Sequence, residues 1–272
     1  MPELTLYHGD CLEVMKEIPE KSIDLIICDL PYGCLERQGR SEESRKKYNR
    51  GNIVGGNIGC PWDVKINLEE FWKQVKRIRK SEHTPTIHFC TTKFGYDLIK
   101  SNEAEFRYDL VWDKGRGVSF LSANKMPMRS HEMIYVFSKA GAFYNRVDIK
   151  GDFKEHKQYG KAIKDSTYSL VNRKTPVVRP PGTITSTSDK RCVLSVIQNN
   201  TSRTGGHPTE KSCDLYRFLV ERYCPAGGTV LDPTFGSGNS VFTAFEMGRN
   251  AIGIEKDSGF FDKAEKKLNG LP

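Results

Sequence analysis

The sequence lacks the features that define several classes of protein. Its 272 residues contain no run of about 18 apolar residues, so no membrane-spanning helix is predicted. Residues 1–20 lack the basic start and the apolar stretch of a secretory signal peptide. No internal repeat or low-complexity tract occurs, and the composition, 37% hydrophobic and 28% charged, is typical of a globular chain. We therefore expect a cytoplasmic protein without a membrane partner.

Cysteine and histidine show no metal-binding pattern. None of the eight cysteines belongs to a C-x-x-C pair and their spacing is irregular, so we predict reduced thiols rather than disulfides or a zinc site. His83, His88 and Cys90 lie close together in the sequence, but they fit a helix end and a buried strand. No bound metal is expected.

Basic residues are in excess. Lys and Arg total 42 against 34 Asp and Glu, which gives a formal charge of +8 and a pI near 9.0. Two segments are notably basic: residues 33–66 hold seven basic against four acidic residues, and residues 141–191 hold eleven against five. This excess of positive charge is compatible with a polyanionic partner. Many basic proteins, however, bind no nucleic acid, and their charge serves only to keep them soluble.

Strand-like and helix-like segments alternate along the chain. Apolar runs predict strands at 23–28, 86–90, 108–112, 132–138, 229–232 and 251–255. Apolar residues at helical spacing predict helices at 68–78, 94–101, 212–223, 239–247 and 259–268. Such alternation indicates an α/β fold with a doubly wound, mostly parallel Rossmann-like sheet.

Two long irregular segments interrupt this pattern. Residues 33–66, rich in Gly, Ser, Asn and charge, are predicted to form a mobile loop within the core. Residues 141–206 show no regular period and carry tyrosines among their basic residues, so they are the candidate target-recognition region. A solvated, flexible insertion is the alternative interpretation. The catalytic core then comprises 1–140 and 207–272.

A glycine-rich loop, Asp-Pro-Thr-Phe-Gly-Ser-Gly-Asn-Ser at 232–240, follows a predicted strand and opens a helix. Gly236 and Gly238 let a ligand approach the backbone at the helix N-terminus, and Glu255 at the end of the next strand suits the ribose hydroxyls of a nucleoside cofactor. Asn239 stands where a phosphate-binding loop has lysine. The carboxylate of Asp232 would repel a pyrophosphate but attract the ammonium group of S-adenosylmethionine.

The turn Asp29-Leu30-Pro31-Tyr32 follows the predicted strand at 23–28. By itself, an Asp-x-Pro-Tyr turn most often only ends a strand. Beside a methyl donor, however, the Asp29 carboxylate and the Leu30 carbonyl could accept the two hydrogens of an exocyclic base amine and localise its lone pair. Pro31 stiffens the turn, and Tyr32 offers a ring on which an extruded base can stack.

Together these motifs resemble those of the amino-group DNA methyltransferase family, which acts on N6 of adenine or N4 of cytosine. The catalytic motif comes first and the glycine loop last, which is the circularly permuted order of the family's beta subgroup. Arg129-Ser-His-Glu132 is similar to the family's segment beside the target-base pocket. The resemblance implies a cofactor site formed by Asp10, Asp29, His207, Thr209, Lys211, Asp232, Phe235, Gly236, Ser237, Gly238, Asn239, Glu255 and Lys256.

The resemblance further implies S-adenosyl-L-methionine as cofactor and double-stranded DNA as substrate. The initial Asp29 favours adenine over cytosine as the target, and Leu30 departs from the family's usual proline. Members of the subgroup often form homodimers and can accompany a partner endonuclease in a restriction-modification system, so both partners are compatible with the resemblance.

Four alternatives remain open at this point. The target could be N4 of cytosine, or the acceptor could be RNA or a protein amide, because related motifs serve those nitrogens. A catalytically silent DNA-binding module would keep the fold without turnover. Carbon methylation of cytosine is disfavoured, because its nucleophile typically stands in a Pro-Cys pair and Cys60 and Cys224 precede proline instead.

Salt should weaken DNA binding steeply if residues 141–191 contact phosphates, because each contact releases condensed counterions. We expect the affinity of the protein for duplex DNA to fall roughly tenfold or more between about 50 and about 200 mM salt. Equilibrium binding titrations measure this dependence, and an affinity that stays flat would contradict the predicted role of the segment.

Overall fold

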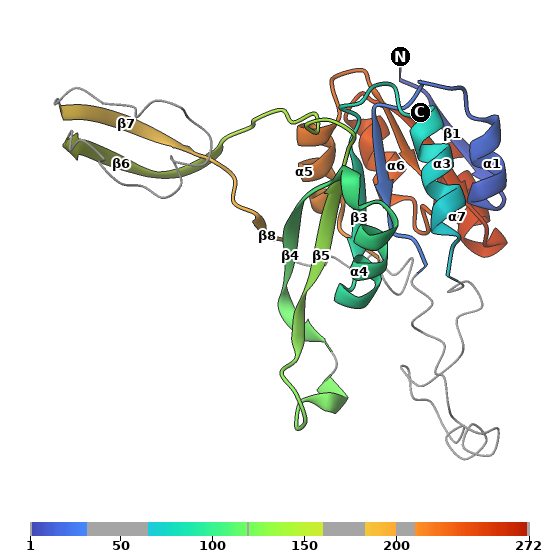
Figure 1. The fold of residues 1–272 in the computed structure, drawn as a ribbon, viewed down its shortest axis with the longest axis horizontal. Coiled ribbons are helices and arrows are strands. Elements are labelled where there is room, and N and C mark those ends of the chain that lie inside the picture. Colours follow the sequence, from blue (N-terminus) through green and yellow to red (C-terminus); the bar gives the residue numbers. More distant parts are fainter. Residues whose placement is uncertain (1, 32–64, 119, 160–182, 200–209, 271–272) are drawn as a thin grey trace. The chain divides into compact units, whose positions relative to one another are not determined.

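The computed structural model describes residues 2–31, 65–118, 120–159, 183–199 and 210–270, shown in Figure 1. These residues form two compact units, one of Met1–Asn145 with Ser195–Pro272 and one of Arg146–Leu194. Almost all of the predicted loop at 33–66 lies outside the described residues, as do Tyr32, His207 and Thr209 of the predicted site.

The first unit is built on an eight-stranded sheet of order β1-β10-β9-β2-β3-β5-β4-β8. Among the described strands of this sheet, the two pairs that β5 forms with β3 and β4 are antiparallel and the other pairs are parallel, so the predicted doubly wound, mostly parallel sheet is confirmed. The strands are β1 (Leu4–His8), β2 (Leu25–Cys28), β3 (Thr86–Cys90), β4 (Phe106–Val118), β5 (Arg129–Phe137), β8 (Val196–Gln198), β9 (Thr229–Asp232) and β10 (Asn250–Glu255).

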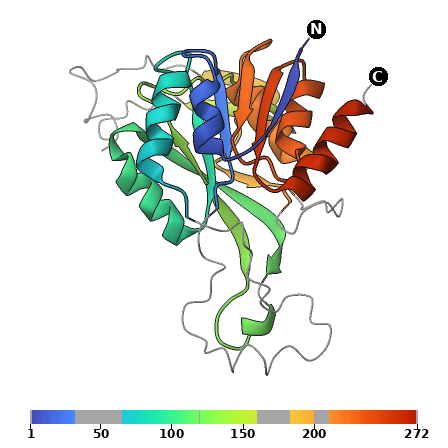
Figure 2. The ribbon, with the colours of Figure 1, turned by 90° about the vertical axis from the view of Figure 1, so that its right-hand side faces the viewer.

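Helices cover both faces of this sheet, as Figure 2 shows. Within the described residues the α-helices are α1 (Cys11–Glu17), α3 (Leu68–Ile78), α4 (Thr92–Ser101), α5 (Cys213–Tyr223), α6 (Asn239–Glu246) and α7 (Ser258–Asn269). Side chains alternate across a strand, so Leu25 and Ile27 of β2 pack in the core with α5, α6 and α7, whereas Ile26 and Cys28 pack in the core with α1, α3 and α4. Burial on both faces explains the continuous apolar run of β2.

The helix α3 shows why local sequence predicts some elements well. Asn67 caps its N-terminus by accepting hydrogen bonds from the backbone N–H groups of Glu69 and Glu70, at 3.1 and 3.2 Å. Acidic residues occupy its first turn and basic residues its last, which complements the helix dipole. Its buried residues share one face, as the spacing of its apolar residues predicted.

The prediction that 141–206 lacks regular structure was wrong. Strands β6 (Ile149–Tyr159) and β7 (Thr183–Arg191) pair antiparallel as a two-stranded sheet in the second unit, and β8 joins the sheet of the first unit beside β4. The sequence of β7, Thr-Ile-Thr-Ser-Thr-Ser-Asp-Lys-Arg, is polar, so it carries little of the apolar alternation that identifies strands. Its threonines nevertheless favour extended backbone.

Gly95 lies where α4 packs closely against the sheet, so a substitution there tests this packing. A Cβ at this position would lie 2.6 Å from Cε2 of Tyr135 and 3.0 Å from Sγ of Cys90. We therefore expect Gly95→Ala to lower the free energy of unfolding by roughly 1–3 kcal/mol, although alanine is the better helix former.

Urea denaturation measures this change, and Gly141→Ala is the matched control because nothing lies within 4 Å of its added Cβ. The control should stay within about 0.5 kcal/mol of wild type. A Gly95→Ala protein more stable than wild type would show that helix propensity outweighs the close contact.

Candidate active site

Four predicted site acids lie at the carboxyl ends of four neighbouring parallel strands. The strands stand in the order β1-β10-β9-β2 in the sheet. Their registers align the ends, because His8 pairs with Glu255, Gly253 with Asp232, and Ile26 with Leu231. The edge of a parallel sheet where strands end is the usual position of a ligand site in such folds. The acids along this edge are Asp10, Glu255, Asp232 and Asp29.

Asp29, directly after β2, is held by a buried cation. The ammonium group of Lys211, whose side chain is only 3% exposed, donates a hydrogen bond to Oδ2 of Asp29. The hydroxyl of Thr234, from the glycine-loop region, donates to the backbone carbonyl of Asp29 at 3.2 Å. The Asp29 side chain remains 25% exposed, so its carboxylate is held by Lys211 and can still be reached from solvent.

Lys211 also joins Asp29 to a second carboxylate. Its Nζ lies 3.9 Å from Oε2 of Glu132 on β5 and 4.5 Å from the centre of the Phe89 ring. The other oxygen of Glu132 accepts a hydrogen bond from Lys114 on β4. Carboxylates and ammonium groups thus alternate from β2 to β4, which compensates charges that would be costly to bury alone.

Leu30 has a structural role that the usual proline could not fill in the same way. Its side chain is 1% exposed and belongs to the apolar core that includes Phe71 and Trp72 of α3. Burying a leucine contributes roughly 1.5–3 kcal/mol. The turn after Asp29 is therefore anchored by the packing of Leu30, and Pro31 follows as the next residue of the turn.

The glycine loop requires glycine at two positions. Gly236 has a φ of +54° and Gly238 a φ of +80°, values that other residues rarely adopt. The Gly236 N–H donates to Oε2 of Glu255 at 2.8 Å, and the Asp257 N–H donates to Oε1 of the same carboxylate at 2.8 Å. Glu255 thus fixes the loop against β10, and its contact with a ribose stays a prediction.

Asp232 is a buried acid at the start of this loop. Its side chain accepts hydrogen bonds from the Ser240 hydroxyl and, at 2.9 Å, from the Thr234 N–H. Burial raises the pKa of Asp232 to about 7; the hydrogen bonds oppose the rise, and the charges of Asp29 and Glu255 add to it. A cation bound beside Asp232 would favour its ionised form.

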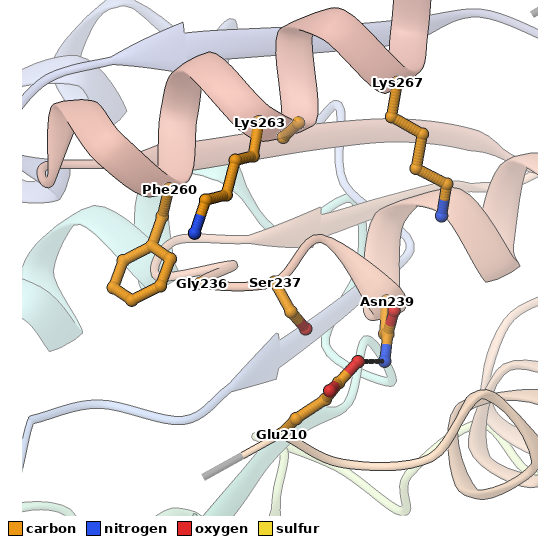
Figure 3. A pocket seen from close by; sticks show the side chains of 8 residues that line it. Glu210, Gly236, Ser237, Asn239, Phe260, Lys263 and Lys267 are labelled. Carbon is orange, nitrogen blue, oxygen red and sulfur yellow. Dashed lines mark hydrogen bonds between the residues drawn. The ribbon is translucent and has the colours of Figure 1, made fainter. Parts of the chain in front are cut away.

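A small cavity of about 180 Å³ adjoins the glycine loop (Figure 3). Asn239 forms part of its wall, and its amide donates to Oε1 of Glu210 at 2.8 Å and to the Lys211 carbonyl at 2.9 Å. The cavity is smaller than the roughly 300 Å³ at which pockets for drug-sized ligands begin, so it can enclose only part of a nucleoside cofactor. Its lining consists of Glu210, Gly236, Ser237, Asn239, Phe260, Lys263, Ala264 and Lys267.

Asp10 occupies the start of α1, which the sequence did not predict as a helix. Its carboxylate caps this helix by accepting from the Leu12 N–H at 3.0 Å and forms an ion pair with Lys256 at 3.0 Å. Partial burial alone would raise the pKa of Asp10, but the bonds from Lys256 and Leu12 lower it. The two predicted cofactor residues Asp10 and Lys256 therefore lie together, beside the end of β10.

Several residues near the site were missed by sequence reasoning. Phe260, Lys263 and Lys267 share one face of α7, and their helical spacing was a usable signal, since residues three or four apart are neighbours on a helix. No local signal identified Lys114, which reaches Glu132 only because β4 pairs with β5.

The buried Asp232 makes the stability of the unliganded protein dependent on pH. The ordinary pKa of an aspartate is 3.8, whereas burial raises the pKa of Asp232 to about 7, so the folded state binds the extra proton between these values. The destabilising effect of Asp232 is absent below 3.8, grows with pH and is complete above about 7. Asp232→Asn, which is isosteric and uncharged, removes it.

We therefore expect the unfolding midpoint of Asp232→Asn to rise relative to wild type as the pH increases from 3.8 to about 7. Thermal unfolding of both proteins without cofactor over this range measures the difference. A constant difference between the two midpoints would contradict the raised pKa.

Comparisons with known proteins identify the family of the chain. The family model described as DNA methylase matches residues 23–266. The type II methyltransferase M.HinfI of Haemophilus influenzae is 27% identical over 98% of this chain and 68% of its own length. The DNA adenine methyltransferase YhdJ of Escherichia coli (strain K12) is 25% identical over 97% of this chain and 82% of its own.

Solved structures show the same fold. The M1.HpyAVI–SAM complex superposes with a TM-score of 0.58 and 18% identity, covering 98% of this chain and 99% of that chain. The PvuII DNA methyltransferase, named as cytosine-N4-specific, gives a TM-score of 0.62 and 16% identity, covering 100% and 89%. Within the described residues, no helix has the length and apolarity needed to cross a bilayer. The chain belongs to the N6/N4 DNA methylase family, whose members are S-adenosylmethionine-dependent DNA methyltransferases.

Proposed function

We propose that the protein transfers a methyl group from S-adenosylmethionine to the exocyclic N6 amine of adenine in double-stranded DNA. The observation that carries this proposal is the pairing of β2 with β9, which brings Asp29 beside the loop that begins at Asp232. A carboxylate for the amine and a cofactor loop then share one edge of the sheet, as a transfer reaction between two bound molecules requires.

Asp29 and the Leu30 carbonyl would activate the amine. Its lone pair is delocalised into the base, so two acceptors that bind its hydrogens favour the pyramidal nitrogen that can attack a methyl group. Lys211 orients the carboxylate of Asp29 toward that task through their ion pair. As the nitrogen is alkylated it becomes positive, and one of its protons can leave toward Asp29.

The residues of the glycine loop and its neighbours fit the methyl donor. When bound, S-adenosylmethionine supplies an electrophilic methyl group on a positively charged sulfur. Asp232 is a buried acid whose pKa of about 7 leaves it ready to ionise beside a cation. Gly236 and Gly238 keep the backbone accessible, while Glu255 and the Asp10–Lys256 pair frame the neighbouring strand ends. The remaining predicted cofactor residues His207, Thr209, Phe235, Ser237 and Asn239 complete the proposed site.

Adenine is the proposed target because Asp, rather than Ser, begins the motif at Asp29. The E. coli relative is named as an adenine methyltransferase, whereas the PvuII enzyme is named as specific for N4 of cytosine. N4 of cytosine is therefore the second candidate target. Tyr32 is proposed to stack on the extruded base in either case.

Residues 141–206 are proposed as the target-recognition region. The described part of this segment includes the β6–β7 hairpin, where Lys150 pairs in register with Lys190 and Ile149 with Arg191. Clustered cations on a strand pair suit contact with phosphates. We also propose that the protein is cytoplasmic, that it forms a homodimer and that it has a partner endonuclease. Several relatives are named type II methyltransferases, which supports a role in restriction-modification.

A series at Asp29 tests the proposed chemistry. Asp29→Ala removes the acceptor, so we expect methyl transfer to fall by at least about 10²-fold, whereas Asp29→Asn keeps one acceptor oxygen and should retain more activity than Asp29→Ala. Asp24→Asn is the matched control. It lies at the other end of β2 and also pairs with a lysine, Lys80, at 3.1 Å. Asparagine keeps an oxygen that can accept the 3.0 Å hydrogen bond from the Thr229 N–H, so activity should stay within about twofold of wild type.

Transfer of a tritiated methyl group to duplex DNA, RNA and protein in parallel measures these activities. Calorimetric titration with S-adenosylmethionine shows whether each variant still folds and binds the donor. Wild-type activity in Asp29→Ala would overturn the mechanism. Transfer to protein or RNA alone would overturn the substrate, and donor binding without any transfer would identify a silent module.

A further inference from the structure

The hairpin of β4 and β5 ends in an exposed apolar tip. Between the two strands, Phe120 is 79% exposed and Leu121 91%, and they lie in a short 3-10 turn at Phe120–Ser122. Met126 and Met128 on the returning segment are 55% and 41% exposed. Figure 1 shows this tip at the end of a long two-stranded arm. Four large apolar side chains on one arm are more than the scattered exposed residues of an ordinary surface.

The arm that carries the tip is basic. Between Asp113 and Glu132 it contains four cations and no acid: Lys114, Arg116, Lys125 and Arg129. Arg116 and Lys125 are exposed, and Arg129 is partly buried beside the tip. The apolar side chains of the tip suit contact with the faces of stacked bases, and the cations of the arm suit contact with phosphates. Duplex DNA offers both, because its stacked bases lie between two phosphate backbones.

The base of the arm belongs to the active site. Lys114 and Glu132 face each other across β4 and β5, and Glu132 lies 3.9 Å from the Lys211 ammonium that holds Asp29. The arm extends from Asp113 to Phe120 over at most about 23 Å, at about 3.3 Å per residue. This upper limit is longer than the depth of either DNA groove, about 7.5–8.5 Å, so the length of the arm allows its tip to reach the base pairs of DNA whose target base is at Asp29.

We propose that the tip of Phe120, Leu121, Met126 and Met128 is a wedge that inserts between base pairs of the DNA substrate and helps to extrude the target base. This inference rests on the proposed function. Proteins that open base steps use the same side-chain types, Phe, Leu, Met and Pro, and Pro127 completes the set here. The wedge lowers the cost of unstacking, which a methyltransferase must meet before Asp29 can reach the amine.

A second copy of this chain is the competing occupant. A symmetric contact would bring the exposed cations Arg116 and Lys125 of one arm close to those of its partner, because a twofold interface joins the same surface on both copies. Like charges held together in that way disfavour association. The charge of the arm thus favours DNA over a subunit interface.

The double variant Phe120→Ala, Leu121→Ala tests the wedge. Duplexes carry the sequence that sequencing finds methylated by the wild type, with the target base either correctly paired or placed opposite an abasic site. We expect kcat/KM to fall at least about tenfold on the paired duplex but to stay within about threefold of wild type on the abasic duplex, where the base is already unpaired. Tyr96→Ala, an exposed aromatic on α4, is the control and should match wild type on both.

Each other outcome overturns the wedge. A variant as active as wild type on the paired duplex shows that the tip is not needed. Equal losses on both duplexes show that it acts in binding or folding instead of base extrusion, and a change in oligomeric state by light scattering assigns it to a subunit interface. Absence of transfer by the wild type itself would overturn the proposed function, and the wedge with it.

Discussion

The parallel pairing of β2 with β9 is the constraint on which the site depends. It joins two halves of the chain that are separated by the second unit, and it places Asp29 and Asp232 at one edge of the sheet. Thr234 bridges them directly, because it donates its hydroxyl to the Asp29 carbonyl and its N–H to the Asp232 carboxylate. Any change that separated these two strands would separate the amine-activating group from the cofactor loop.

This arrangement brings several acidic groups close together. Each acid has a different partner, which offsets the repulsion between the carboxylates and the cost of burying them. Asp29 is paired with a buried ammonium, Asp10 with an exposed one, Glu255 with two backbone N–H groups, and Asp232 with a hydroxyl and one N–H. Asp232 is the most deeply buried of them, and these two uncharged donors offset its burial less than an ammonium would, which is consistent with its raised pKa. The edge therefore favours a cationic ligand beside the glycine loop.

Local patterns predicted the strands that are buried on both faces and the helix α3, which is buried on one face. The bounds of β3, β9 and α3 were predicted as the structure has them, because continuous apolar runs and one-sided helical spacing are strong signals. The edge strand β1 was missed because its burial is only partial, and the β6–β7 hairpin was missed because its residues are polar. Contacts between residues far apart in the sequence could not be predicted from local patterns. The hydrogen bond between Lys211 and Asp29 joins residues 182 positions apart, so Lys211 was predicted only as a cofactor residue.

We propose above all that this edge of the sheet methylates an exocyclic amine of a DNA base, with adenine as the target. The most direct measurement is mass spectrometry of the nucleosides obtained from unmethylated duplex DNA after incubation with the protein and S-adenosylmethionine carrying a deuterated methyl group. We expect the label in N6-methyladenine. Label in N4-methylcytosine would contradict the choice of adenine, and label in 5-methylcytosine or in no base would contradict the account itself.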